Sequence, residues 1–205
     1  MKQGPSAYRS IPGWLSDNEA QCLFDIVRRT PGNVSEAGTF YGKSTSVLCE
    51  GMLASGQSAC RLVSYDLPIT SERQFREFVR SLGHVEADIM EMPPLLVDTW
   101  KRGTSSSDEA WKYLQYFNLD HLVELKVGDF RQDTGSYEVL FFDVMHGETE
   151  IEPNIAHVAR LARPKAIVAF HDMYPDLSLK HAIEKSSTKL QFFRLVDTLG
   201  LFQRI

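Results

Sequence analysis

The sequence predicts an α/β protein: a doubly wound, mostly parallel seven-stranded sheet with helices on both faces and a C-terminal antiparallel strand pair. Short apolar runs alternate with amphipathic stretches along most of the 205 residues, the pattern of parallel strands joined by helices. The run 139–143 is apolar up to its last residue, as expected for a central strand buried on both faces. Two apolar runs, 190–196 and 201–205, close the chain with only a short turn between them, which favours an antiparallel pair.

The first helix is expected directly after Ser16. Glu19 follows three residues later, the spacing of a reciprocal capping box, and apolar residues then recur at helical spacing up to Val27. The dipeptide Pro-Gly at 31–32 ends this helix. The other expected elements are helices at 43–54, 71–82, 108–117, 150–161 and 177–185 and strands at 34–37, 61–66, 122–127, 139–143 and 166–171.

We expect these elements to form one domain, 1–205, with a helical segment at 1–32. The stretch 84–107 reads as the least regular part of the chain, with Met, Pro and Trp residues and a Gly-Thr-Ser-Ser-Ser loop. Long irregular insertions in compact domains are often functional, so we interpret it as a lid over an apolar substrate. A structural cap or a contact between copies in a homo-oligomer is the alternative.

Composition excludes several classes of protein. Hydrophobic residues make up 43% and charged residues 24%, which is ordinary for a soluble globular chain. No apolar stretch is long enough to span a membrane, and residues 1–9 lack the apolar core of a secretory signal. A net charge of −5 disfavours nucleic acid as a partner. Cys22, Cys49 and Cys60 lack metal-type spacing, which indicates thiols in a reducing, cytoplasmic compartment.

A glycine-spaced turn is the most informative feature. Residues 36–45 read Glu-Ala-Gly-Thr-Phe-Tyr-Gly-Lys-Ser-Thr and join the first strand to a helix. Gly38 and Gly42 let the backbone approach a bound molecule, and the helix points its N-terminal amides at the same place. Many α/β domains hold the polar part of a nucleotide-like cofactor in this way. The candidate cofactor contacts in this segment are Glu36, Gly38, Thr39, Tyr41, Gly42 and Ser44.

Polar residues also end the other expected strands. Asp66 ends the second strand, Asp143 the fourth, and His171 with Asp172 the fifth. Because the carboxyl ends of parallel strands meet at one edge of a sheet, we expect these side chains and the turn to form a single site.

The turn could bind one of three kinds of cofactor. A phosphate-binding P-loop needs four residues between its glycines, whereas Gly38 and Gly42 enclose three, and Glu36 would repel a phosphate. NAD binding lacks its Gly-x-Gly-x-x-Gly spacing. S-adenosylmethionine fits best, because it has no phosphate, its methionine end is cationic near Glu36, and its ribose hydroxyls suit Asp66.

The chain also resembles the class I S-adenosylmethionine-dependent methyltransferases, in particular the small-molecule O-methyltransferases related to macrolide-sugar and catechol-type enzymes. The turn at 36–45 looks like that group's first motif, and Pro-Gly-Trp-Leu-Ser at 12–16 is similar to the segment before its first helix. Phe-Phe-Asp-Val-Met-His at 141–146 resembles its Asp-Gly-x-His element, and Phe-His-Asp-Met-Tyr at 170–174 its His-Asp-Tyr element.

The resemblance covers about 12–66 and 122–205 and implies a Rossmann-like fold. This chain departs from the group at three places: Val144 replaces a usual glycine, Ala37 a bulkier aliphatic residue, and Arg-Pro-Lys at 163–165 the glycine pair common before the fifth strand.

The resemblance also implies roles. Asp129 would lie near the adenine, and Asp143 would serve the cofactor and, with Asp172 and the helper His171, a Mg²⁺ ion. His146 would be the base that accepts the proton of a small-molecule hydroxyl. Each role has a plainer reading from the residues alone: Asp143 as a helix cap or the partner of a buried cation, His146 as a surface residue. A P-loop-like nucleotide-binding protein and a catalytically silent cofactor-binding or interaction protein remain alternatives.

Overall fold

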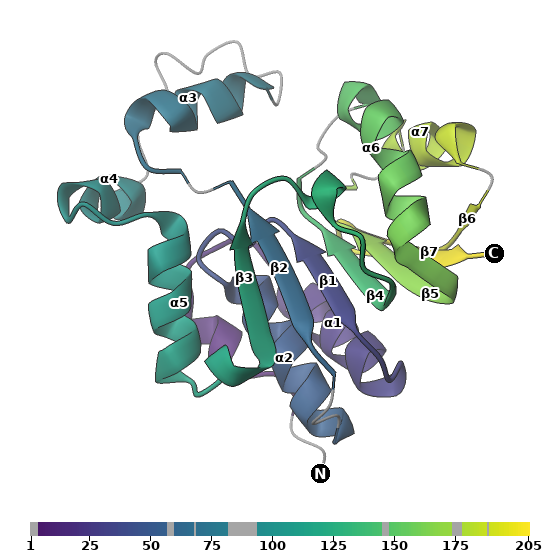
Figure 1. Ribbon diagram of the computed structural model, residues 1–205, viewed down its shortest axis with the longest axis horizontal. Coiled ribbons are helices and arrows are strands. Elements are labelled where there is room, and N and C mark those ends of the chain that lie inside the picture. The colour runs from purple at the N-terminus through teal and green to yellow at the C-terminus, as the bar shows by residue number, and fades with distance from the viewer. Residues whose placement is uncertain are drawn as a thin grey trace.

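The computed structural model describes residues 4–56, 60–67, 69–81, 94–144, 148–173, 178–187 and 189–205. A single seven-stranded sheet runs through it in the order β3-β2-β1-β4-β5-β7-β6 (Figure 1). The strands are β1 (Val34–Ala37), β2 (Leu62–Asp66), β3 (Val123–Val127), β4 (Tyr137–Phe142), β5 (Ala162–Phe170), β6 (Leu190–Val196) and β7 (Leu199–Arg204). The first five pair in parallel, and β7 is antiparallel to β5 and β6. The predicted fold class is therefore confirmed.

Helices precede β1 and lie in most of the connections between successive strands. They are α1 (Asp17–Arg29), α2 (Lys43–Ser55), α3 (Glu72–Ser81), α4 (Pro94–Lys101), α5 (Ser106–Tyr116), α6 (Glu148–Leu161) and α7 (Ser178–Ser186), with 3-10 turns η1 (Ala7–Ser10), η2 (Asp120–Leu122) and η3 (Phe130–Gln132). Among the described residues, none of these helices has both the length and the apolar character needed to cross a membrane.

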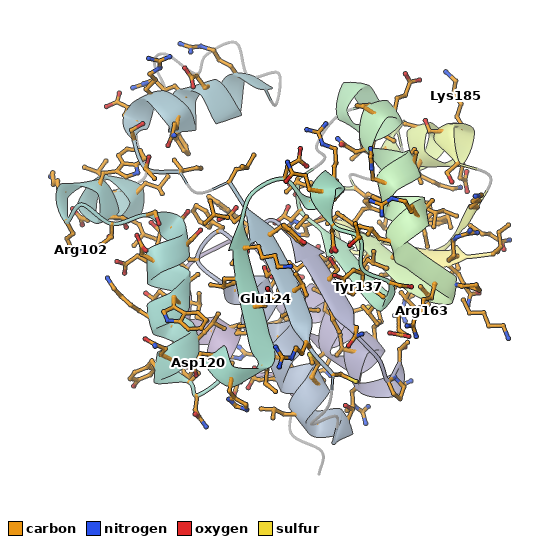
Figure 2. The ribbon with its side chains drawn as sticks, viewed as in Figure 1. Arg102, Asp120, Glu124, Tyr137, Arg163 and Lys185 are labelled. Atoms are coloured by element: carbon orange, nitrogen blue, oxygen red, sulfur yellow. The ribbon has the colours of Figure 1, made fainter. Side chains whose placement is uncertain are left out.

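Alternating side chains of the central strands build two cores. Val139 and Phe141 of β4 pack with α1 and α2, whereas Leu140 and Phe142 pack with α6 and α7 on the opposite face. Burying each such side chain contributes about 1.5–3 kcal/mol. The labelled Arg102 and Lys185, near the C-terminal ends of α4 and α7, point away from the sheet (Figure 2). Helices thus cover both faces, as predicted.

The start of α1 has the predicted cap. The Ser16 hydroxyl accepts a hydrogen bond from the Glu19 N–H at 3.2 Å, and the Glu19 carboxylate accepts one from the Ser16 N–H at 2.9 Å. These bonds satisfy donors that a helix start would otherwise leave unpaired.

The stretch 84–107 is more regular than predicted. Residues 94–101 form the helix α4. Pro94 occupies its first position, where a proline without an N–H does not interrupt the helix. The next helix begins at Ser106 instead of 108, since Ser105 caps it. With α3, α4 lies beyond the carboxyl ends of β1 to β3 (Figure 1). Residues 82–93 lie outside the described part of the chain, and the lid role remains a prediction.

The fifth strand also begins earlier than predicted, at Ala162 instead of 166. Its register against β4 shifts between Tyr137 and Val139, and Lys165 has a φ of 69°. The Arg-Pro-Lys segment therefore enters the strand through a local irregularity, which the sequence pattern does not predict.

Candidate functional site

The predicted polar residues gather at the carboxyl-terminal edge of the sheet, around the gap between β1 and β4. Strand order reverses there, because the chain leaves β1 toward β2 and β3 on one side and returns to β4 on the other. The glycine turn follows β1, Asp143 follows β4, and His171 with Asp172 follows β5. In doubly wound sheets this switch point is where ligands bind.

The turn approaches β4 very closely. Gly38 has a φ of +102° and its N–H donates to the Tyr65 carbonyl at 2.8 Å. The Asp143 N–H donates to the Ala37 carbonyl, also at 2.8 Å. Gly42, with a φ of +84°, is the residue before α2, so both glycines occupy conformations that other residues rarely adopt.

Glu36 lies beneath this turn and is fully buried. Its two carboxylate oxygens accept hydrogen bonds from the hydroxyls of Ser44 at 2.5 Å, Thr45 at 2.6 Å and Ser64 at 2.5 Å. Burial raises the pKa of Glu36 to about 7 despite these donors. The side chain supports the turn from inside, and a direct contact with a bound cation stays a prediction.

Asp66, at the end of β2, faces the same turn. Its carboxylate accepts hydrogen bonds from the backbone N–H groups of Leu67 and Phe40 and from the Ser107 hydroxyl at 3.2 Å. Phe40 directs its N–H there from a left-handed conformation, φ 47°. Burial raises the pKa of Asp66 to about 6. Such an acceptor beside a glycine turn suits a ribose diol.

Two further turn residues, Thr39 and Tyr41, are buried. The Thr39 hydroxyl lies 2.5 Å from that of Ser64. The Tyr41 ring is buried in the cluster formed with Leu96, and its hydroxyl lies 2.9 Å from that of Thr99 in α4. The ring thus joins the turn to α4, and a contact between Tyr41 and a cofactor stays a prediction.

Asp129 lies after β3, farther along the same edge of the sheet. Its carboxylate accepts a hydrogen bond from the Arg131 N–H at 2.9 Å and pairs with the Arg131 guanidinium. The hydrogen bond from Arg131 keeps its pKa below the ordinary value. The side chain caps η3, and its predicted place near an adenine is untested by these contacts.

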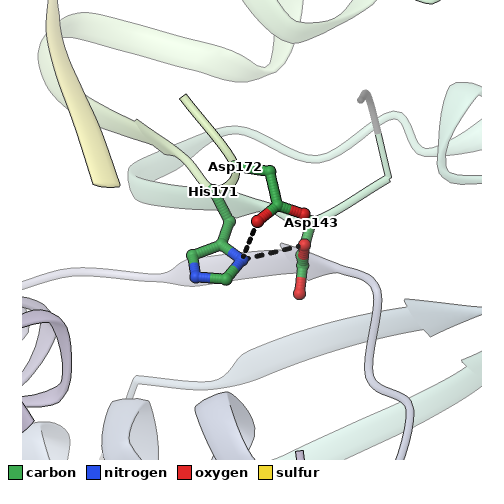
Figure 3. A group of neighbouring side chains, drawn as sticks. All are labelled: Asp143, His171 and Asp172. Carbon is green, nitrogen blue, oxygen red and sulfur yellow. Dashed lines mark hydrogen bonds and ion pairs between the residues drawn. The ribbon is translucent and has the colours of Figure 1, made fainter. Parts of the chain in front are cut away.

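Asp143, His171 and Asp172 form one cluster (Figure 3). The Nδ1 atom of His171 lies 3.2 Å from Oδ1 of Asp143 and 3.4 Å from Oδ1 of Asp172. Asp172 turns its carboxylate back toward the ring from a left-handed conformation, φ 57°. A carboxylate oxygen from each Asp and a His171 ring nitrogen lie within 4.8 Å of one another, close enough for one metal ion to contact all three.

The other ring nitrogen of His171 faces a residue that the sequence patterns marked only as a helix cap. Nε2 lies 3.4 Å from Oε2 of Glu19, and both side chains are buried. Burial alone would lower the pKa of His171, but Asp143 and Glu19 raise it to about 10. Burial likewise opposes ionisation of Glu19, yet His171, Ser16 and Thr198 together lower its pKa to about 2.

Among the contributors to the site that sequence reasoning missed are Glu19 and Ser107. Glu19 was hidden by its capping pattern, and Ser107 by its place in a serine-rich loop; no local signal links either to a strand end far along the chain. His146, the predicted base, lies outside the described residues.

Comparisons with known proteins agree with this geometry. A family model described as a methyltransferase domain matches residues 35–173. No curated protein matches the chain.

Three solved structures illustrate the likeness. TomG of Streptomyces achromogenes, an O-methyltransferase of tomaymycin synthesis in complex with SAM, is 18% identical with a TM-score of 0.56, covering 93% of this chain and 79% of TomG. An O-methyltransferase from Bacillus cereus in complex with SAH is 14% identical with a TM-score of 0.58, covering 97% and 86%. A SAM-dependent O-methyltransferase from Thermotoga maritima is 14% identical with a TM-score of 0.61, covering 98% and 71%. At such identities the likeness establishes the fold.

Proposed function

Because the chain belongs to the methyltransferase domain family, we propose that it transfers a methyl group from S-adenosylmethionine to a hydroxyl of a small molecule, assisted by a divalent metal ion. The observation that carries the proposal is the cluster of Asp143, His171 and Asp172 beside the glycine turn and Asp66. A candidate cofactor site and a candidate metal site thus share one edge of the sheet. O-methyltransferases among the structural neighbours, some in complex with SAM or SAH, support this choice of reaction.

The cofactor's parts are assigned by chemistry. Gly38 and Gly42 would line the methionine moiety, Asp66 would accept hydrogen bonds from the ribose hydroxyls, and Asp129 would lie toward the adenine. Glu36 would affect the cofactor indirectly, by holding the turn, since its oxygens already accept hydrogen bonds from three hydroxyls of the protein. The turn is therefore preorganised before the cofactor arrives.

The donor set suits a hard divalent cation. The carboxylates of Asp143 and Asp172 are each 30% exposed, so solvent and an acceptor can reach them, whereas His171 is 5% exposed. Two carboxylates favour Mg²⁺ or Mn²⁺, and an imidazole nitrogen is the less usual third donor for Mg²⁺. Both ions therefore belong in the test.

When bound, the cofactor supplies an electrophilic methyl group, and the ion would lower the pKa of the acceptor hydroxyl. Asp143 and Asp172 would orient the acceptor through that ion, and His146 would take its proton, as the sequence predicts. Residues of α4, within the predicted lid segment 84–107, would contribute an apolar wall around the acceptor.

The P-loop alternative is not favoured, because the lysine that it needs points elsewhere. The ammonium of Lys43 donates to the Ile11 carbonyl at 3.1 Å and lies 5.7 Å from the centre of the Tyr8 ring. It is committed to the N-terminal segment, away from any phosphate at the turn.

Two measurements test the proposal. Calorimetry with SAH and with ATP measures which ligand the turn accepts, and a methyl-transfer screen over catechols, glycosides and polyketides, with and without Mg²⁺ or Mn²⁺, measures activity. We expect Asp143→Ala and Asp172→Ala to abolish transfer while SAH affinity changes little, and Asp66→Ala to weaken SAH binding first.

Asp120→Ala is the matched control, because Asp120 lies at the opposite end of β3 (Figure 2). It should change neither quantity. Tighter binding of ATP than of SAH, lost on changing Lys43, would favour the P-loop reading instead. SAH binding with no transfer to any acceptor would favour a silent cofactor-binding protein.

A further inference from the structure

The buried carboxylate of Glu19 joins three distant parts of the chain. Its Oε1 atom accepts hydrogen bonds from the N–H and the hydroxyl of Thr198, at 2.9 and 2.7 Å. Its Oε2 atom accepts one from the Ser16 N–H at 2.9 Å and lies 3.4 Å from Nε2 of His171. Both oxygens are occupied, so the side chain is held in a single orientation.

The two nitrogens of the His171 ring point to opposite partners. Nε2 faces Glu19 inside the protein, and Nδ1 faces Asp143 and Asp172 at the candidate metal site (Figure 3). In a rigid ring, a hydrogen bond that fixes the direction of Nε2–H also fixes the direction of Nδ1, whose proton a bound metal ion would replace. Glu19 thus occupies the Nε2 side of the ring, and Nδ1 faces the candidate metal site.

The residues that hold the His171 ring in place lie outside the segment 35–173 that matches the family model. Glu19 belongs to α1, and Thr198 belongs to the turn between β6 and β7. The same turn accepts a hydrogen bond from the Met173 N–H at the Thr198 carbonyl, 2.8 Å. Asp197 accepts another from the Ser16 hydroxyl, 2.5 Å. The residues directly after β5 are therefore held by α1 and by the turn between β6 and β7.

We propose that Glu19 is a positioning residue that holds the His171 imidazole with Nε2–H turned inward and Nδ1 presented to a divalent ion bound by Asp143 and Asp172. This inference rests on the metal site of the proposed function. Hydrogen bonds from a ligating histidine to a carboxylate commonly serve this purpose, and their loss typically lowers metal affinity 10–100-fold.

Glu19→Gln tests the assignment with almost no change in volume. An amide has one oxygen, so whichever way it turns, its NH₂ group meets either the donors of Thr198 or those of Ser16 and His171. Mn²⁺ affinity, measured by electron paramagnetic resonance without cofactor, should fall 10–100-fold relative to the unaltered protein.

Thr198→Val is the control. It removes one hydroxyl from the same carboxylate but leaves the Thr198 backbone N–H and the contact between Oε2 and His171. Its Mn²⁺ affinity should stay within about threefold of the unaltered protein's, even where thermal unfolding shows a loss of stability. A general loosening of the network would instead weaken both variants alike.

Nuclear magnetic resonance of ¹⁵N-histidine-labelled protein gives a readout that needs no Glu19 variant, with His171→Asn used for assignment. On addition of Mg²⁺ or Zn²⁺, we expect the Nδ1 resonance of His171 to shift while Nε2 keeps its proton. A metal-induced shift at Nε2, or unchanged ring resonances despite metal binding, overturns the inference. Equal Mn²⁺ affinity in Glu19→Gln also overturns it while leaving the proposed function intact. An unaltered protein that binds neither Mn²⁺ nor Mg²⁺ overturns both.

Discussion

Gly38 and Asp143 approach so closely that a Cβ atom on Gly38 would lie 2.5 Å from the carbonyl oxygen of Asp143. The contact joins the glycine turn after β1 to the loop that carries the first candidate metal ligand. The Asp143 N–H also donates to the Ala37 carbonyl, so a hydrogen bond joins the two loops directly before the glycine. The proposed cofactor and metal sites are therefore adjacent along this backbone contact, and we expect a change in one loop to affect the other.

Gly38→Ala should therefore be strongly destabilising. The new methyl group collides with backbone, and the φ of +102° is unfavourable for alanine. Together, strain and overpacking should lower the free energy of unfolding by about 2–4 kcal/mol, measured by urea denaturation. Gly103→Ala separates the two effects, because Gly103 has a φ of +70° with nothing within 4 Å of its Cβ position. Equal losses in both variants would show that the approach to Asp143 is not what requires glycine.

Cofactor binding should depend on pH through Asp66. Burial raises the pKa of Asp66 to about 6, so the acceptor that ribose hydroxyls need is largely protonated below pH 6. SAH affinity, measured by calorimetry, should rise between pH 5 and 7 by up to about tenfold and then level off. Asp66→Asn should bind SAH weakly with no such rise. A wild-type affinity that is flat over this range would contradict the assignment of Asp66 to the ribose.

The stability of the folded protein should depend on pH through Glu36. Unlike the SAH affinity, it should fall as the pH rises. Its pKa of about 7 in the folded protein lies above the ordinary value of 4.5, because burial disfavours the charged form. Between these values the folded state binds more protons than the unfolded state, so the free energy of unfolding falls as pH rises through this window. Glu36→Gln removes the titration. The stability of Glu36→Gln relative to wild type should thus increase from pH 5 to pH 8 by roughly 1–3 kcal/mol in denaturant titrations. Parallel profiles for the two proteins would exclude a buried, raised-pKa Glu36.

Local signals predicted the elements well where the responsible residues are neighbours in sequence. The capping pair Ser16 and Glu19 places the start of α1, and the apolar run of β4 places the central strand. The helix α4 was missed because Pro94 reads as a breaker in sequence although the first helical turn tolerates it.

The site was predictable as a set of strand ends but not as a network. Ser64 reaches Glu36 from the neighbouring strand, and Glu19 meets His171 from 152 positions away. Neither contact can be recognised from a repeating pattern in a single sequence. One of the three hydroxyls bound to Glu36 comes from Ser64, outside the motif, so the pKa of Glu36 cannot be predicted from that motif alone.

The start of β5 offers a stabilising substitution. Lys165 is exposed and has a φ of 69°, a left-handed conformation that costs an ordinary residue about 1 kcal/mol relative to glycine. Lys165→Gly relieves this strain but gives the unfolded chain more freedom, so the net gain in the free energy of unfolding should be about 0.5 kcal/mol. Lys165→Ala keeps the strain while removing the long side chain, and it should leave stability nearly unchanged. Glycine inside a regular strand lowers the free energy of unfolding. If Lys165→Gly does so by about 1 kcal/mol in urea denaturation, that result contradicts a left-handed conformation of Lys165 near the start of β5.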